Sequence, residues 1–116
     1  HNIYGAEIAE KLLTELNYTQ DRIERVKKCV LNHRGSSNAV RDTIEEQCVA
    51  DADVIAHFDC IPSLFHLAYK ERNMTVPEGE EFIKKKLQGD YNKLSDRTRE
   101  LLKDRYKNIL NVLFTK

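Results

Sequence analysis

Residues 3–16 read IYGAEIAEKLLTEL, and apolar side chains recur in this stretch at the spacing of an α-helix. An interval of three or four residues returns a side chain to the same side of a helix, whereas a strand would need strict alternation. The pattern predicts a first helix from about Tyr4 to Leu16. The apolar positions at this spacing are Ile3, Ala6, Ala9, Leu12, Leu13 and Leu16.

The same spacing continues along the rest of the chain and predicts further helices, separated by short polar breaks. Thr19 is a plausible N-cap for the second helix, and Ser95 for the last one. Gly89 is expected to interrupt the helix before the last. The predicted helices after the first span about 19–32, 42–56, 62–72, 78–87 and 95–114.

The predicted helix over 42–56 carries several of the candidate functional residues. Asp42, followed three residues later by Glu45, resembles a capping box and predicts where the helix begins. The positions that we expect to point inward from this helix are Ile44, Cys48, Val49, Ala52, Ile55 and Ala56.

Length and composition favour one all-α domain over residues 1–116. The chain has 116 residues, of which 41% are hydrophobic and 33% charged, a globular rather than a disordered composition. Only four glycines and two prolines are present, too few for an all-β fold with many tight turns.

Charge and cysteine usage exclude several classes of function. Lys plus Arg and Asp plus Glu are both 19, so a neutral chain is not expected to bind nucleic acid. No apolar run approaches the ~20 residues of a membrane span. Three cysteines without a CxxC pair predict buried free thiols in a reducing compartment, and we therefore expect a cytoplasmic protein.

Polar residues beside or within apolar helical stretches are the candidates for chemistry. His33 follows the apolar stripe of the second predicted helix, where it could also be a helix cap. Asp51 and Asp53 lie two residues apart and cannot share one helix face, so one is expected to point inward. Asp53 is the one that we expect to do so, and a carboxylate there needs a metal, a cation or hydrogen-bond donors.

A mixed set of imidazoles and carboxylates suits Zn, Mn, Fe, Ni or Mg better than a thiolate site would. An alternative partner for Asp53 is His57, four residues later on the same helix face.

Three short motifs together resemble one known family. Residues 1–13, HNIYGAEIAEKLL, resemble the helix with an HxxxGAxIA pattern in the HD-domain metal-dependent phosphohydrolases. Leu31-Asn32-His33 is similar to the end of the following helix in that family. Residues 49–54, VADADV, are similar to its later helix, which supplies a metal-binding aspartate. Residues 101–106 also resemble the closing helix of small members.

The resemblance implies an HD-domain-like bundle of about five to six helices that hydrolyses a phosphate ester or anhydride with a metal-bound water. By matching position, Asp53 would bind the first metal, with Asp51 the less favoured candidate. His1 and His33 would correspond to histidines that bind a second metal or the substrate phosphate. No His-Asp dipeptide occurs in the chain. We therefore expect the family's His-Asp dyad upstream of His1, in N-terminal helices that this sequence lacks.

The resemblance thus predicts an enzyme, an HD-type phosphohydrolase that needs a divalent metal and acts on a phosphorylated small molecule, with a nucleotide as one candidate. The chain by itself is expected to be inactive if the dyad lies outside it. The alternative is a non-catalytic helical interaction module that keeps the fold. The expected partner is the phosphorylated substrate, with a homo-oligomer as a further candidate and with no nucleic acid and no membrane.

Overall fold

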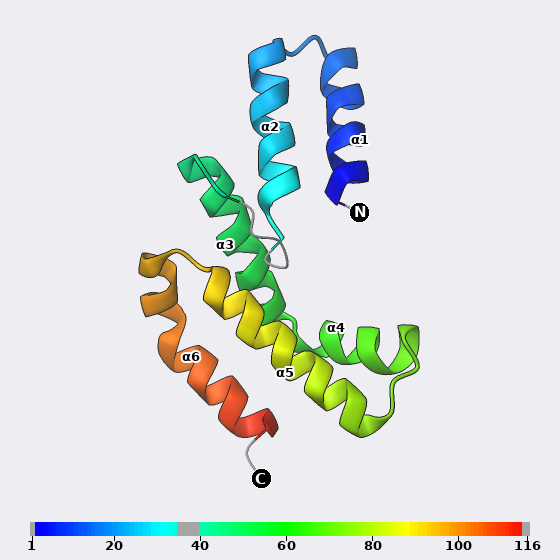
Figure 1. The fold of residues 1–116 in the computed structure, drawn as a ribbon, viewed down its shortest axis with the longest axis vertical. Helices are drawn as coiled ribbons and strands as arrows, with labels where there is room; N and C mark the ends of the chain where they lie inside the picture. The colour runs from blue at the N-terminus through cyan, green and yellow to red at the C-terminus, as the bar shows by residue number, and fades with distance from the viewer. Residues whose placement is uncertain (1, 35–39, 115–116) are drawn as a thin grey trace. The chain divides into compact units, whose positions relative to one another are not determined.

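The computed structural model describes residues 2–34 and 40–114, and these residues form six α-helices, one π-helical turn and no strand (Figure 1). The predicted all-α fold is therefore confirmed. The chain divides into two compact units, residues 1–53 and 54–116, which are described separately below. In chain order the elements are α1 (Asn2–Glu15), α2 (Gln20–Asn32), α3 (Ile44–Asp59), α4 (Ile61–His66), η1 (Leu67–Glu71), α5 (Val76–Lys93) and α6 (Asp96–Phe114).

Helices α1 and α2 form a hairpin because small residues of α1 let the two helices approach closely (Figure 1). A Cβ atom on Gly5 would lie 3.2 Å from Cγ1 of Val30, and Ala6 beside it is buried. The Asn2 amide donates to the Leu31 carbonyl (2.9 Å), and Lys27 pairs with Glu10 (2.8 Å). The first contact joins the start of α1 to the end of α2. The second joins the middle of α1 to the middle of α2.

The turn of the hairpin is made by Asn17, whose φ of 59° lies in the left-handed region. The backbone N–H of Tyr18 donates to the Leu13 carbonyl and that of Asn17 to the Thr14 carbonyl, both at 3.0 Å. This pair of bonds is a Schellman motif, which satisfies carbonyls that the end of a helix leaves without partners. Helix α1 consequently ends at Glu15, one residue before the predicted Leu16.

The opposite face of α1 is apolar and exposed. Its residues recur mainly every four positions and form a continuous stripe, which we name the α1 stripe. Exposed fractions along it range from 42% to 67%. The stripe consists of Ile3, Tyr4, Ile8, Leu12 and Leu16.

Helix α3 differs from the sequence prediction in both its cap and its buried face. The cap lies one residue later than predicted, because the Thr43 hydroxyl accepts from the Glu46 N–H (3.2 Å) and donates to the Glu46 carboxylate (3.1 Å). The row at four-residue spacing that is buried consists of Glu46, Ala50, Val54 and Phe58.

The predicted inward face of α3 was therefore wrong. Five of its six predicted members are exposed, namely Cys48, Val49, Ala52, Ala56 and Ile44, the last at 76%. Apolar residues occur on every side of this helix, so spacing alone could not identify the side that packs. The prediction of buried thiols was also wrong, since Cys48 and Cys60 are exposed and Cys29 is only partly buried.

The second unit has an apolar core to which the last residues of α3 and helices α4, α5 and α6 contribute. Val54, Leu64, Ile83 and Leu87 lie within it at 3% exposure or less. Aromatic rings extend this core toward α6: Tyr106 stacks on Tyr91 with ring centroids 3.9 Å apart, and on Phe58 at 6.1 Å. Stacked rings of this kind add to the free energy gained by burying their area.

Helix α5 runs without a break from Val76 to Lys93, so the predicted interruption at Gly89 was wrong. A glycine in a helix costs only about 1 kcal/mol relative to alanine. Burial of Ile83, Leu87 and Asp90 on both sides of Gly89 outweighs that cost. The helix begins with a capping box in which Thr75 and Glu78 bond each other's backbone N–H.

Both ends of α6, the cap at Ser95 and the last residue Phe114, agree with the sequence, and one predicted element changes type. Ser95 caps α6 as predicted, since its hydroxyl accepts from the Thr98 N–H (3.4 Å). The predicted helix over 62–72 is α4 followed by the π-helical turn η1. Within the described ranges, no helix combines the length and the apolar character that crossing a membrane requires.

We predict opposite effects of alanine at the two glycines of α5. A Cβ atom on Gly79 would lie 2.8 Å from Cζ of Tyr69, whose ring stacks on Phe65, so Gly79→Ala should destabilise the protein by about 1–3 kcal/mol. The exposed Gly89 has no atom within 4 Å of its would-be Cβ, so Gly89→Ala should stabilise by about 0.5–1 kcal/mol. Urea unfolding of both variants measures the two effects, and equal effects would contradict the close Gly79–Tyr69 packing.

Candidate functional site

A cluster of polar contacts fastens the end of α2 to the first turn of α3, and we name it the Glu46 cluster. It consists of Asn32, Arg41, Thr43 and Glu46. The Asn32 amide donates to the Glu46 carboxylate (2.7 Å), and the Arg41 guanidinium donates to the backbone carbonyls of Asn32 (2.9 Å) and Arg34 (3.2 Å). The cluster fixes the position at which the backbone leaves α2, which is where His33 lies.

The carboxylate of Glu46 is ionised within this cluster although the residue is only 1% exposed. The hydrogen bond from Asn32 lowers the pKa of Glu46 below its ordinary value of 4.5, and the bond from Thr43 lowers it further, while burial opposes both. A buried carboxylate needs such donors because loss of hydration disfavours its charged form.

His33 is the C-cap residue of α2, and its imidazole is oriented by the backbone of its own helix. The ring nitrogen Nδ1 hydrogen-bonds the carbonyl oxygen of Val30. A carbonyl only accepts, so Nδ1 must carry the hydrogen, and in the neutral ring the lone pair is on Nε2. Histidines that bind metals through Nε2 usually have this arrangement, with the other ring nitrogen held by a carbonyl or carboxylate.

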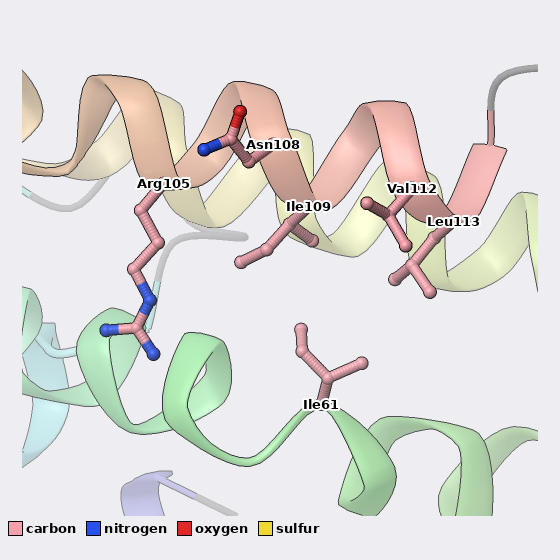
Figure 2. A pocket seen from close by; sticks show the side chains of 6 residues that line it. All are labelled: Ile61, Arg105, Asn108, Ile109, Val112 and Leu113. Atoms are coloured by element: carbon pink, nitrogen blue, oxygen red, sulfur yellow. The ribbon is translucent and has the colours of Figure 1, made fainter.

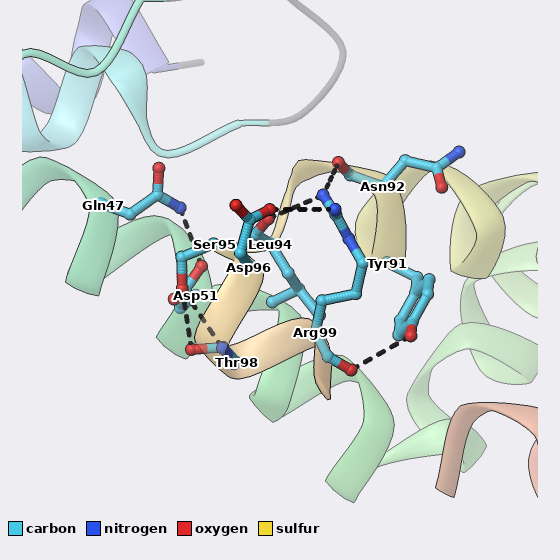
Figure 3. Close-up of polar contacts among 9 residues, drawn as sticks. All are labelled: Gln47, Asp51, Tyr91, Asn92, Leu94, Ser95, Asp96, Thr98 and Arg99. Atoms are coloured by element: carbon cyan, nitrogen blue, oxygen red, sulfur yellow. Dashed lines mark hydrogen bonds and ion pairs between the residues drawn. The ribbon is translucent and has the colours of Figure 1, made fainter. Parts of the chain in front are cut away.

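Asp51 and Asp53 lie on α3, in the same unit of the chain as His33. Asp51 is 8% exposed and its carboxylate accepts a hydrogen bond from the Gln47 amide one turn earlier, at 2.8 Å (Figure 3). Asp53 is half-buried. The sequence favoured Asp53 as the inward residue, and in the structure Asp51 is the more enclosed of the two. Which of them binds a metal stays a prediction.

The third predicted ligand, His1, lies outside the described residues. Among the residues that the structure describes, no group of three or more His, Cys, Asp or Glu side chains could hold a metal ion. His33, Asp51 and Asp53 therefore do not make up a metal site by themselves.

A histidine–aspartate pair that the sequence analysis missed lies in the second unit. Nδ1 of His57 is 2.8 Å from Oδ2 of Asp90, and Lys86 donates to the same oxygen at 3.4 Å. The sequence suggested Asp53 as the partner of His57 because only neighbours on one helix were considered. One signal for Asp90 was present, since it continues the row of buried Ile83 and Leu87 on α5.

The contacts of Asp90 compensate a buried charge. Asp90 is 5% exposed, and two donors that can carry positive charge contact its carboxylate. Removing one partner of such a buried pair would leave an uncompensated charge, which is the usual reason that pairs of this kind persist.

Arg99 is a cation of the later helices that serves structure rather than a ligand. Its guanidinium donates to the carbonyls of Asn92 and Leu94, both at 2.9 Å, and pairs with Asp96 at 3.3 Å (Figure 3). The Tyr91 hydroxyl donates to the Arg99 carbonyl at 3.1 Å. These bonds hold the turn between α5 and α6.

An apolar groove between α4 and α6 has a volume of about 510 Å³ (Figure 2). Ile61, Ile109 and Val112 line it, and the guanidinium of Arg105 at its edge donates to the Phe58 carbonyl and pairs with Asp59. No acid, base or nucleophile is among its described lining residues, so the groove offers apolar surface without chemistry.

We predict that the Glu46 cluster stabilises the protein in a pH-dependent way. Glu46→Gln should destabilise by about 1–2 kcal/mol at neutral pH, because a hydrogen-bonded charge is replaced by a neutral amide. The folded-state pKa of Glu46 is lowered, so its contribution is present above pH 4.5 and is lost as the pH falls through that lowered value. The wild-type protein and the Glu46→Gln variant should therefore approach equal free energies of unfolding in acid.

Urea unfolding between pH 3 and pH 7 measures this difference, with Glu45→Gln as the matched control. Glu45 is the exposed neighbour that pairs with Arg25 at 3.2 Å, and its replacement should change stability by less than about 1 kcal/mol. A loss at Glu46 that stays the same over the whole pH range would contradict the ionised carboxylate.

The chain was compared with family models, with curated proteins and with solved structures, and it matches none of them.

Proposed function

We propose that this chain belongs to a metal-dependent phosphohydrolase of the HD type, acting on a phosphorylated small molecule. His33 and Asp53, with Asp51 as the other candidate, are the residues that we assign as donors to the metal. The observation that carries the assignment is the orientation of His33, whose Nδ1 is held by the Val30 carbonyl, so that in the neutral ring the lone pair is on Nε2.

The Glu46 cluster supports the same assignment. It joins the turn that bears His33 to the helix that bears both aspartates, through the Asn32–Glu46 bond. A site made from two helices requires that each donor keeps its position before the metal arrives, and buried hydrogen bonds behind the donors provide this. All of these residues belong to the N-terminal unit, 1–53.

The described donors alone do not complete the coordination of a metal ion. We therefore assign to His33 and the aspartates only the part of holding a metal that further ligands complete. His1 is the predicted ligand outside the described residues, and the His-Asp dyad of the resembled family would be another source.

The test is Mn²⁺ binding and Mn²⁺-dependent hydrolysis of 4-nitrophenyl phosphate, measured on the longest natural form of the protein. His33→Gln should lower metal affinity about tenfold or more, because a ligand is lost. Asp51→Asn and Asp53→Asn should separate the two aspartates: the ligand loses metal and activity, whereas the other retains both.

His66→Gln is the matched control, since His66 is an exposed histidine of α4 that pairs with Glu71 at 3.1 Å. Thermal unfolding of each variant establishes that it is folded. Unchanged metal affinity and activity in folded His33→Gln, Asp51→Asn and Asp53→Asn would contradict the proposal.

A second candidate function is supported by the α1 stripe. Five large apolar side chains are exposed along α1 and the turn that follows it, and large exposed apolar patches commonly mark interaction sites. Charges of both signs, Glu7, Lys11 and Glu15, lie beside the stripe at four-residue spacing. A surface with both signs can pair with a copy of itself, as a twofold dimer requires. In this case the chain is a non-catalytic helical module that binds a second copy through α1.

We predict that the dimer, if this second function holds, depends on the centre of the stripe. Leu12→Glu should convert a species of twice 13.5 kDa into a monomer, because a carboxylate would be buried in the interface. Light scattering after size-exclusion chromatography measures the mass. Val112→Glu is the control, since Val112 is 82% exposed on α6. A monomeric wild-type protein at high concentration would rule out this function.

A further inference from the structure

The N-terminal unit contains a second cavity, of about 360 Å³, on the side of α2 that faces the start of α3. Its volume falls within the range of small-molecule sites, about 300–1,000 Å³. Neither His33 nor Asp51 nor Asp53 lines it. The cavity is therefore separate from the residues that we assign to the metal.

Positive charge gathers on one wall of this cavity. Arg22, Arg25 and Lys28 follow one another at three-residue spacing on α2 and all line it. Arg25 pairs with Glu45 at 3.2 Å. Arg22 and Lys28 have no hydrogen-bond or ion-pair partner among the residues described, and both are exposed enough to turn toward a ligand.

The acidic residues of the cavity cancel this charge only in part, and the charge of Lys28 also acts on Glu46. Glu45 is taken by Arg25, and the oxygens of Glu46 are taken by Asn32 and Thr43. Three cations against two carboxylates leave the lining with a net positive charge in a chain whose total charge is zero. An anion with several oxygens fits a guanidinium and an ammonium better than a single neutral acceptor would.

The rest of the lining is mainly apolar, with Thr43 as its one uncharged hydrogen-bonding side chain besides Tyr18. Tyr18 and Val26 also face the cavity, and they are 45% and 39% exposed. An aromatic ring beside basic groups suits a ligand that joins an anionic group to a flat ring. Cys29 is at the cavity too, but burial and the nearby Glu46 raise its pKa, so its thiol stays protonated and does not act as a nucleophile.

We propose that this cavity binds a small phosphate monoester that carries a flat ring, with Arg22 and Lys28 contacting the phosphate and Tyr18 and Val26 contacting the ring. Binding needs no metal, so it is independent of the phosphohydrolase function proposed above. A nucleic-acid strand does not fit the same observations, because the cavity is small and the chain as a whole is neutral.

The experiment is a ¹H–¹⁵N NMR titration of the chain with phenyl phosphate in excess EDTA, which excludes any metal-dependent binding or turnover. Saturable shifts should gather at the backbone amides of Tyr18, Arg22, Val26 and Lys28. Inorganic phosphate should bind more weakly at the same amides, and phenol should not saturate. Arg22→Gln and Lys28→Gln should each weaken phenyl phosphate about tenfold, and Lys103→Gln, an exposed cation of α6, should leave its affinity unchanged.

Each contrary result overturns a stated part of the proposal. No saturable binding of either phosphate compound, or equal affinities in Arg22→Gln, Lys28→Gln and Lys103→Gln, would overturn the site itself. Equal affinities of phenyl phosphate and inorganic phosphate would overturn the contact with Tyr18 and Val26. Loss of metal binding in His33→Gln with unchanged phenyl phosphate binding would support two separate sites.

Discussion

The buried carboxylate of Glu46 is the constraint on which the N-terminal unit depends. A charge at 1% exposure is tolerated only if donors replace its lost water, and here Asn32 and Thr43 supply them. Meeting that need brings the last turn of α2 against the first turn of α3. The same requirement therefore positions His33, which follows Asn32 directly, and shapes the cavity that Glu46 helps to line. The hydrogen bond between Asn32 and Glu46 thus helps to position both the proposed metal ligand His33 and the proposed phosphate-binding cavity.

The C-terminal unit meets its constraints differently. Its core is apolar and aromatic, and Gly79 lets the ring of Tyr69 approach α5 closely. The one buried charge on α5, Asp90, is compensated by His57 and Lys86, and Arg99 is occupied with backbone carbonyls at the turn into α6. Asp90, its partners His57 and Lys86, and Arg99 therefore act in holding the fold. This is why we look for ligand-binding residues in the N-terminal unit.

The metal site and the phosphate site that we propose in the N-terminal unit depend on different interactions. The metal proposal rests on a histidine whose tautomer is set by a backbone carbonyl and on carboxylates in the middle of a helix. The phosphate proposal rests on two cations that the described residues leave without ion pairs. Because no residue is shared between the two sets, each can fail without the other. A protein that holds both sites would have a metal for hydrolysis and a separate place for a phosphorylated molecule.

The sequence by itself determined the all-helical class and the ends of α2, because these follow from the spacing of apolar residues. It also determined the cap of α6 at Ser95, because that cap depends on a side-chain bond to a backbone only three residues away. It also marked His33 and the two aspartates as unusual. Only the tertiary structure decided which side of α3 is buried, because α3 has apolar residues on every side and packing chooses among them. The same holds for the pairing of His57 with Asp90, 33 residues away, and for the continuity of α5 through Gly89. Burial along α5 outweighed a local preference of about 1 kcal/mol there, and no local rule contains that burial.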